Sequence, residues 1–203
     1  EVSSPCVENA RLEWSAAVVR ETVFKYNHAD GSVGGMSCLD GACELSNVVF
    51  LGNDAMLCGG FGGADAVATL TGCTFALNSA SPFQGGGANC GPGSQFTFSR
   101  CIFAFQQQGG GISCEEGSFT PTVEHCCVYG NIGEDYSCGG YGDSVSADPL
   151  FCNLPVDDLT LSHESVCLPA NNVWGEQIGA FGEGCDDSPV VGTSWGVLKG
   201  LFR

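Results

Sequence analysis

Five stretches of the chain align without internal gaps: VRETVFKYN at 19–27, LSNVVFLGN at 45–53, LTGCTFALN at 70–78, FSRCIFAFQ at 98–106 and VEHCCVYGN at 123–131. Their first residues lie 26, 25, 28 and 25 positions apart. A period in the twenties is typical of one turn of a solenoid and is too short for a propeller blade, which needs about 40 residues. The repeat therefore predicts that the chain winds into stacked coils.

Four columns of equivalent residues emerge from this alignment. Three are apolar or small and are predicted to face the interior. The second and third are two residues apart, the strand period, whereas the first and second are three apart, which predicts a corner between two strands. The fourth column is predicted to be a ladder of amides that bond from coil to coil at the next bend. The core columns are Val19, Leu45, Leu70, Phe98 and Val123; Thr22, Val48, Cys73, Cys101 and Cys126; and Phe24, Phe50, Phe75, Phe103 and Val128; the amide ladder is Asn27, Asn53, Asn78, Gln106 and Asn131.

A glycine-rich element recurs between these stretches, as GGMSC at 34–38, GGFGG at 59–63, GGANC at 86–90 and GGISC at 110–114. It predicts another wall of the solenoid with two inward columns, namely Met36, Phe61, Ala88 and Ile112, and Cys38, Gly63, Cys90 and Cys114. A β-sandwich is the competing fold, but its strands differ in face and direction and do not require aligned columns.

The chain has 14 cysteines, and their spacing is not that of paired zinc knuckles. This number indicates an oxidising compartment. Cys38 and Cys43 flank a four-residue turn and are a candidate local disulfide. Stacked coils lie about 4.8 Å apart, within the Cα separation of roughly 4.4–6.8 Å that a disulfide needs. Two candidate inter-coil pairs are therefore Cys73 with Cys101 and Cys90 with Cys114; the alternative is that these are free thiols packed as small apolar side chains.

The residues after the last repeat resemble a known group. ADPLFCN from Ala147, DDLTLSHESVCLPANN from Asp157 and IGAFGEGC from Ile178 are similar to the closing coils of pectin-lyase-like right-handed parallel β-helices, particularly the bacterial secreted type. The stretch 165–167 lacks the proline of that pattern. Over 19–185 the resemblance implies an all-β, right-handed parallel β-helix of about 6–8 coils with disulfide staples. It implies no single function, because such repeats occur in lyases, adhesins, coats and structural proteins.

The net charge is −17, from 6 Lys and Arg against 23 Asp and Glu. This charge argues against nucleic acid and anionic membrane surfaces as partners. No run of about 18 apolar residues is present, so no membrane span is predicted. The sequence starts at Glu1 without a basic or apolar leader, as expected of an exported product after signal-peptide removal. We therefore expect a secreted, extracellular or cell-surface protein.

The sequence offers little catalytic chemistry. The resemblance implies, for polysaccharide lyases, acidic calcium ligands beside a Lys or Arg base, but Arg100 is the only basic residue between Lys25 and Lys199 and is predicted to lie at a solvated corner. A glycoside hydrolase needs two carboxylates about 5–9.5 Å apart, and the acidic doublets at 115–116, 157–158 and 186–187 do not align in the repeat. We predict no catalytic residue, no metal site and no cofactor, with calcium at 157–158 or 186–187 as the alternative.

The ends of a solenoid carry unpaired backbone that recruits other strands unless it is capped. Residues 1–18 are predicted to be an N-terminal segment or first-coil cap, 19–185 the β-helix, and 186–203 a hydrophobic C-terminal tail. The tail either covers the last coil of its own molecule or pairs with the next subunit. The candidate subunit contact consists of Val191, Trp195, Val197 and Leu201.

A head-to-tail contact of this kind does not close and produces a filament. We therefore expect a non-enzymatic extracellular structural protein, a self-assembling β-solenoid subunit whose main partner is itself, stacked into a stable filament or surface layer. The alternatives are a glycan-binding or adhesive surface module, which needs an exposed aromatic groove, and a carbohydrate-active β-helix enzyme, which needs clustered carboxylates.

Overall fold

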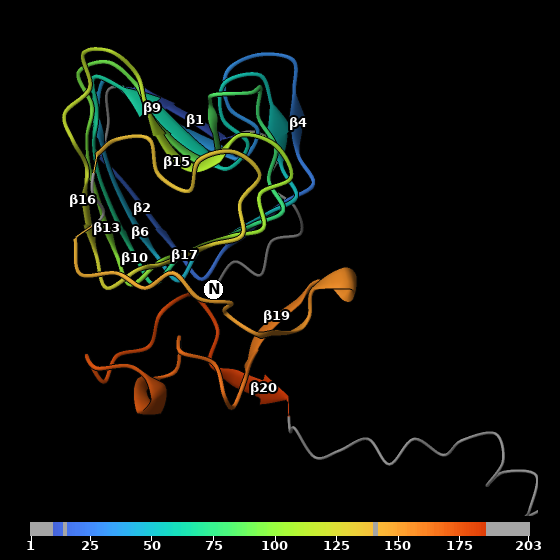
Figure 1. The fold of residues 1–203 in the computed structure, drawn as a ribbon. Helices are drawn as coiled ribbons and strands as arrows, with labels where there is room; N and C mark the ends of the chain where they lie inside the picture. The colour runs from blue at the N-terminus through green and yellow to red at the C-terminus, as the bar shows by residue number, and fades with distance from the viewer. Residues whose placement is uncertain (1–9, 14–15, 140–141, 186–203) are drawn as a thin grey trace, which may run out of the picture.

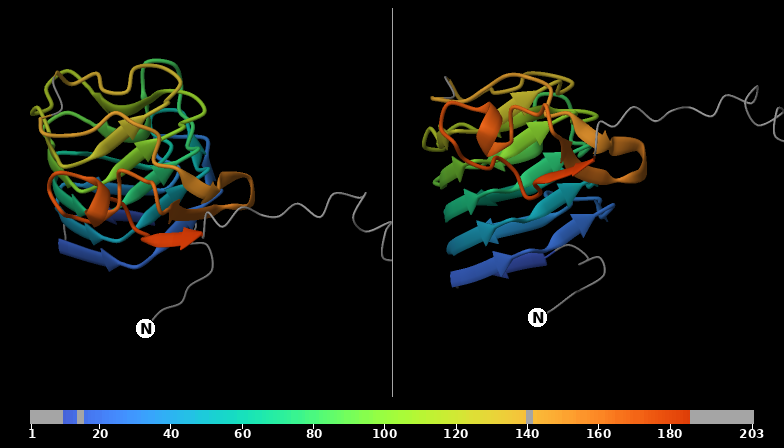
Figure 2. Two further views of the ribbon diagram at one scale, coloured as in Figure 1. Left: turned by 60° about the horizontal axis from the view of Figure 1, so that its bottom comes forward. Right: turned by 90° about the horizontal axis from the view of Figure 1, so that it is seen from below.

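The computed structural model describes residues 10–13, 16–139 and 142–185. The chain forms an all-β parallel solenoid of about seven turns with almost no helix. Figure 1 looks nearly along the solenoid, and the right-hand view of Figure 2 shows the strands of successive turns stacked on one another. The predicted fold class, a stack of parallel coils, is confirmed.

Three five-stranded parallel sheets form the walls. Each of five successive turns contributes one strand to each sheet, in order. Sheet A contains β1 (Ala10–Glu13), β5 (Met36–Leu39), β9 (Phe61–Ala64), β12 (Gly85–Cys90) and β15 (Gly110–Cys114). Sheet B contains β2 (Ala16–Arg20), β6 (Ala42–Ser46), β10 (Val67–Thr71), β13 (Gln95–Ser99) and β16 (Thr122–Glu124). Sheet C contains β3 (Val23–Lys25), β7 (Val49–Leu51), β11 (Thr74–Ala76), β14 (Ile102–Ala104) and β17 (Cys127–Tyr129).

The corner between sheets B and C lies where the strand period breaks. One residue of each turn adopts a left-handed backbone conformation there, with φ between 47° and 61°. This single residue reverses the side-chain alternation, so the residues on either side of the bend both face inward. The corner residues are Glu21, Asn47, Gly72, Arg100 and His125.

A stack of phenylalanine rings fills the interior beside sheet C. The rings of Phe24, Phe50, Phe75 and Phe103 lie nearly parallel, with centroids 5.1, 4.8 and 4.4 Å apart. The predicted core residues Leu45, Leu70, Phe98, Val123, Phe24, Phe50, Phe75 and Phe103 are at most 4% exposed, whereas Val19 and Thr22 of the first turn are only half-buried. The stack explains the glycine pairs: a Cβ on Gly60 would lie 2.3 Å from the oxygen of Gly87 and 2.9 Å from the Phe75 ring.

The amide column forms a continuous ladder at the bend that follows sheet C. Asn27 Nδ2 donates to Asn53 Oδ1, and Asn53 Nδ2 to Asn78 Oδ1, each over 3.0 Å. Asn78 Nδ2 donates to Gln106 Oε1 over 3.2 Å, and the Gln106 backbone N–H donates to Asn131 Oδ1. These side chains satisfy buried backbone groups as well, since the Asn53 N–H donates to Asn78 Oδ1. The ladder therefore fixes the register between turns.

The solenoid begins earlier than residue 19. Strands β1 and β2 already pair with β5 and β6, so residues 10–13 and 16–18 belong to the first turn rather than to a separate segment. At the other end, the described residues 131–139 and 142–146 cross the last complete turn without regular strands. Tyr136 bridges to Ile112, Val145 bridges to Cys127, and Asp143 O accepts from the His125 N–H.

Residues 148–185, which we call the clasp, do not form the closing coils that the resemblance implies. They fold back over the outer face of sheet C (Figure 1). The clasp contains the mixed sheet of β18 (Phe151–Asn153), β19 (Asp158–Ser162) and β20 (Glu183–Cys185), and the 3-10 turns Leu154–Val156 and Pro169–Asn171. The physical reason is that the outward residues of sheet C, such as Val49, Leu51 and Ile102, are apolar and need a cover.

Three disulfides are present among the described residues. The local pair Cys38–Cys43 is as predicted, with Cα atoms 6.5 Å apart. The predicted pair Cys90–Cys114 is wrong, because Cys114 bonds to Cys138 in the irregular last turn. The third bond, Cys152–Cys185, closes the clasp.

The predicted pair Cys73–Cys101 is also wrong, since both are free buried thiols. In-register parallel strands point these side chains the same way, and each thiol donates to a backbone carbonyl, Cys73 to Thr71 and Cys101 to Leu70. The alternative reading, a column of thiols packed as small apolar residues, is what the structure contains.

Candidate functional site

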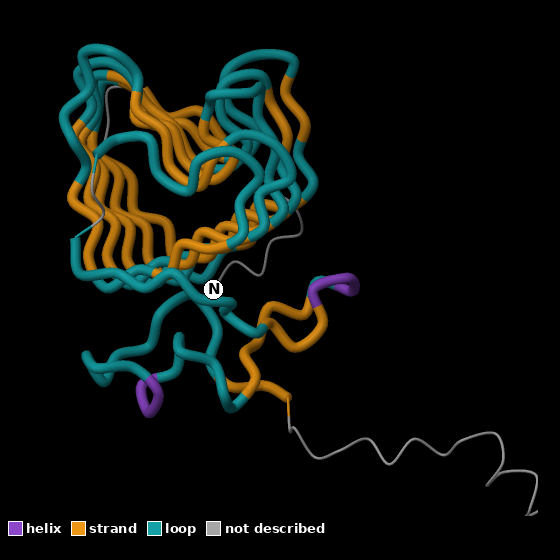
Figure 3. Tube along the Cα trace, in the orientation of Figure 1, coloured by secondary structure: helices purple, strands orange, loops and turns teal. Residues whose placement is uncertain are grey.

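A groove runs along the outer face of sheet A. Its floor is formed by sheet residues such as Ser37, Gly62 and Ser113. One of its walls is the stack of loops that follows β4 (His28–Ala29) and β8 (Asp54–Ala55). Figure 3 shows sheet A at the bottom of the indentation between two sets of loops. The groove is widest at the last complete turns, where it opens into a cavity of about 600 Å³.

The floor of the groove carries a chain of polar side chains. Residues Ser37, Gly62, Asn89 and Ser113 occupy one outward column of sheet A. Ser113 Oγ donates to Asn89 Oδ1 over 2.7 Å, and Asn89 Nδ2 donates to Glu115 Oε1 over 2.6 Å. Asn89 is 5% exposed and Ser113 is 4% exposed. This series of hydrogen-bonded side chains contains one carboxylate, that of Glu115, and its members bond to one another.

The cavity of about 600 Å³ is rimmed by apolar side chains. Phe83 is 98% exposed and Ile132 is 64% exposed, although both are large hydrophobic residues. Three glutamines, Gln84, Gln107 and Gln108, line the same cavity, and Glu134 lies on its rim. This combination of exposed apolar surface, amides and one acid offers contact area and hydrogen bonds to a ligand.

Farther along the groove, His28 lies between two carboxylates. Its Nδ1 is 2.8 Å from Asp54 Oδ2, and its Nε2 is 3.3 Å from Asp30 Oδ1. The hydrogen bonds to Asp54 and then to Asp30 raise the pKa of His28, while desolvation opposes them. All three groups are well exposed to solvent, so the cluster is an ordinary surface ion pair.

The free thiols show no sign of activation. Burial raises the pKa of Cys58, of Cys101 and, to about 12, of Cys90. Contact with Cys127, followed by burial, raises the pKa of Cys167. A nucleophilic cysteine requires a lowered pKa and access to solvent. These thiols therefore serve packing.

Asp157, the first residue of the acidic doublet at 157–158, holds the clasp to the solenoid. Asp157 lies 2.5 Å from Lys25 Nζ and accepts a hydrogen bond of 2.5 Å from Tyr26 Oη. Contact with Lys25 and then with Tyr26 lowers the pKa of Asp157. Asp158 Oδ1 accepts from Thr160. Within the described ranges, no group of three or more His, Cys, Asp or Glu side chains is placed to hold a metal ion.

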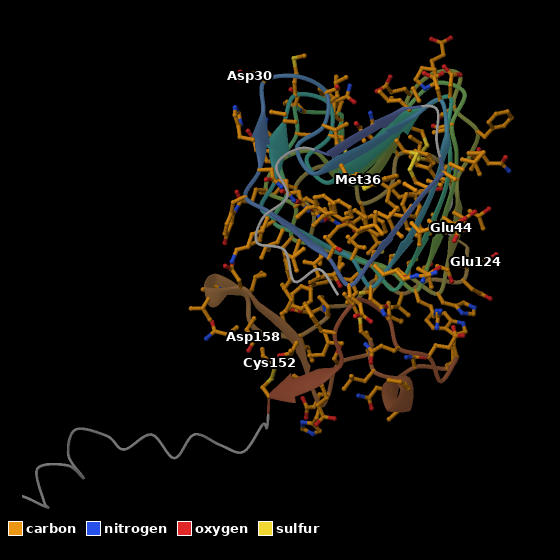
Figure 4. All side chains as sticks on the ribbon, turned by 180° about the vertical axis from the view of Figure 1, so that it is seen from behind. Asp30, Met36, Glu44, Glu124, Cys152 and Asp158 are labelled. Carbon is orange, nitrogen blue, oxygen red and sulfur yellow. A yellow bond between two sulfur atoms is a disulfide. The ribbon has the colours of Figure 1, made fainter. Side chains whose placement is uncertain are left out.

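The outer face of sheet B is a second exposed surface. One outward column runs through Val18, Glu44, Thr69, Thr97 and Thr122, and the next runs through Arg20, Ser46, Thr71, Ser99 and Glu124. Figure 4 shows Glu44 and Glu124 on this outer side, whereas Met36 lies inside the solenoid. The second column begins with a basic residue and ends with an acidic one.

The remaining predicted residues divide into two groups. The amide ladder and the core columns lie inside the solenoid and have structural contacts only. The candidate subunit contact, Val191, Trp195, Val197 and Leu201, lies outside the described residues, as does the acidic doublet at 186–187.

Sequence reasoning missed the groove. The outward column that contains Asn89 and Ser113 was available from the alignment of the glycine-rich elements, since each residue there precedes a residue of the inward cysteine column. The exposed Phe83 carries no such signal, because it lies in a loop insertion that makes one repeat 28 residues long.

Comparison of the chain with known protein families, with curated proteins and with solved structures finds no match. Within the part of the chain that the structure describes, no helix is long and apolar enough to cross a membrane.

Proposed function

We propose that the protein is a non-enzymatic structural protein of the cell exterior, whose solenoids stack head to tail into a filament or surface layer. The observation that carries this proposal is the outward column of sheet B that begins with Arg20 on β2 and ends with Glu124 on β16. The two ends of one column thus carry opposite charges.

Stacking two copies along the solenoid axis would place the irregular last turn of one copy, in which Asp143 O accepts from the His125 N–H beside β16, against β2 of the next. Among the described strands, β2 pairs only with β6, and β16 pairs only with β13. Glu124 on β16 and Asp143 in that last turn would then lie near Arg20 of the next copy, as opposite charges at the junction. Because the contact joins two different ends, it does not close and extends without limit.

The absence of an enzymatic role is part of the proposal and is supported by the groove. The hydrogen-bonded polar side chains on its floor include one carboxylate, that of Glu115, whose Oε1 accepts from Asn89. Glycoside hydrolysis needs two carboxylates flanking the bond. An extracellular location is supported by the three disulfides, which persist in oxidising compartments.

A glycan-binding module is the second candidate, and the cavity beside Phe83 favours it. An exposed aromatic ring with three glutamine amides nearby offers both a stacking surface and hydrogen bonds to a sugar. Binding of a neutral oligosaccharide, lost in Phe83→Ser and retained in Phe119→Ser, would favour this candidate; Phe119 is also exposed but does not line the cavity.

The stacking proposal is tested by charge reversal at the junction. The purified, non-reduced chain is imaged by negative-stain electron microscopy beside Arg20→Glu, Glu124→Arg and the double variant, and beside a chain truncated after Cys185. We expect filaments from the unchanged chain, loss in each single variant and recovery in the double variant. Uniform monomers from the unchanged chain at every concentration, or single variants that still form filaments, would overturn the proposal.

A further inference from the structure

The cavity at the wide end of the groove has an unusual rim. Phe83, at 98% exposed, and Ile132, at 64% exposed, are among the most exposed large hydrophobic residues of the described chain. They come from loops of different turns and line one cavity of about 600 Å³ together with Pro82. Apolar side chains that converge on one concave site are typical of a place where another apolar segment docks.

One segment of the same chain has the matching composition. Residues 188–203 read SPVVGTSWGVLKGLFR, in which apolar residues alternate with small ones. Of the six basic residues of the chain, Lys199 and Arg203 lie here, and the segment contains no acidic residue. All 23 acidic residues precede it. The segment is therefore opposite in charge to the body of the protein, which would attract it to an acidic surface.

The described residues that line the cavity include one acidic side chain and no basic one. The acidic side chain is that of Glu134. Gln84, Gln107 and Gln108 can donate and accept hydrogen bonds along an extended peptide.

The C-terminal segment follows Cys185 in the clasp, on the side of the solenoid away from the groove, and the proposed stacking supplies a neighbouring copy as its acceptor. Residue 185 is fixed by the Cys152–Cys185 bond in the clasp, which covers sheet C. Figure 1 shows β20 below the solenoid and sheet A on its opposite side. The 18 residues after Cys185 span at most about 60 Å when extended, a reach that covers the cavity of a copy stacked along the axis as well as that of the same copy, and the crosslinking test distinguishes the two.

We infer that residues 188–203 of one copy occupy the cavity beside Phe83 and Ile132 of a neighbouring copy and act as a latch between subunits. Trp195 supplies the apolar anchor against this rim, and Lys199 or Arg203 faces Glu134. The inference rests on the proposed self-assembly and names a second contact for it, separate from the junction between Arg20 and Glu124.

The test uses the full chain with a photo-crosslinking amino acid in place of Trp195. Isotopically light and heavy chains are mixed, irradiated and analysed by mass spectrometry, so that crosslinks within and between copies are distinguished. We expect crosslinks that join light to heavy chains at 82–84, 107–110 or 132–137. Crosslinks confined to one chain, crosslinks at another surface, or none would each overturn the inference.

A paired variant provides the control. Phe83→Ser with Ile132→Ser removes the apolar rim and should reduce the crosslink yield about tenfold, which corresponds to about 1.4 kcal/mol. Phe119→Ser with Val173→Ser removes two other exposed hydrophobic residues and should leave the yield unchanged. Equal yields in the two variants would contradict the inference.

The same mixtures are imaged by electron microscopy to separate the two proposals. Groove crosslinks without filaments would leave the latch intact and contradict axial stacking. Filaments without groove crosslinks would support stacking and overturn the latch.

Discussion

The solenoid and the clasp are both β-structure, but they are held by different kinds of contact. In the solenoid, each turn repeats the contacts of the last, as in the phenylalanine stack and the amide ladder. The clasp is attached to the solenoid by contacts that each occur once, such as Tyr26 with Asp157 and Thr74 with the Ala180 N–H. Within the clasp, the Cys152–Cys185 bond joins its two ends.

This difference has a thermodynamic consequence. Repeated contacts spread stability over the turns, so that no turn can open without its neighbours. A segment attached by singular contacts can open on its own below the global unfolding free energy. We therefore expect the clasp to detach from sheet C before the solenoid unfolds.

The largest expected effect is at the centre of the repeated core. Phe75 is fully buried and its ring stacks on those of Phe50 and Phe103. Phe75→Ala should lower the free energy of unfolding by about 3–5 kcal/mol, because it opens a cavity in the stack. Urea denaturation followed by circular dichroism measures this. Phe83→Ala, at an exposed position, should change it by no more than about 0.5 kcal/mol.

The next effect concerns the clasp alone. Replacing both Cys152 and Cys185 with Ser removes a bond that spans 33 residues, which lowers the stability of the clasp by about 3–4 kcal/mol on the chain-entropy account. Hydrogen exchange should then accelerate in 148–185 while β10 keeps its protection. Equal loss of protection in both regions would contradict the division into two units.

A smaller effect is expected in the amide ladder. Asn78→Ala removes Asn78 Oδ1, the acceptor of both the Asn53 backbone N–H and the Asn53 side-chain amide. We expect a loss of about 2–3 kcal/mol, because buried unsatisfied groups lose their hydration without compensation. Gln95→Ala, on the exposed face of β13, is the control in the same denaturation experiment. A loss under about 0.5 kcal/mol would indicate that water replaces the amide.

The smallest effect is at the contact between clasp and solenoid. Tyr26→Phe removes the hydrogen bond to Asp157 and should weaken clasp docking by about 0.5–1.5 kcal/mol. Fluorescence of Trp174, whose ring stacks on His125, reports docking when the other two tryptophans are replaced by Phe. In the control variant Tyr129→Phe, which keeps the ring contact with Phe105, the clasp should dock normally.

The same contact predicts a dependence on pH. The pKa of Asp157 is lowered in the folded protein by Lys25 and Tyr26. Its contribution to docking is therefore fully present above the ordinary pKa of aspartate, about 3.9, and is lost as the pH falls through the lowered value. The Trp174 signal should change in that acidic range in the unchanged chain and at a higher pH in Lys25→Met. Identical midpoints would show that Asp157 does not carry the dependence.

The repeated part of the molecule could be predicted because local patterns determine it. Phe50 and Phe75, or Asn53 and Asn78, are found by alignment alone, since each turn imposes the same environment on equivalent residues. The clasp could not be predicted. Nothing in the sequence around Asp148 distinguishes one more coil from a chain that reverses onto sheet C, although the apolar outward residues Val49 and Ile102 do require a cover.

The groove and its cavity, like the last disulfide of the solenoid, were not predicted. Pairing of Cys114 with Cys138 depends on where the irregular last turn lies, which no repeat determines. The cavity beside Phe83 arises from loops of different turns, so that no single stretch of sequence reveals it.

X-ray diffraction from aligned filaments of the full chain tests the central claim most directly. Stacked turns are about 4.8 Å apart, so axial stacking predicts a reflection at this spacing on the meridian, parallel to the filament axis. Arg20→Glu should form no filaments. The double charge-reversal variant should form them again, with the same reflection. Filaments with this reflection on the equator would contradict the account, because their solenoids would pack side by side.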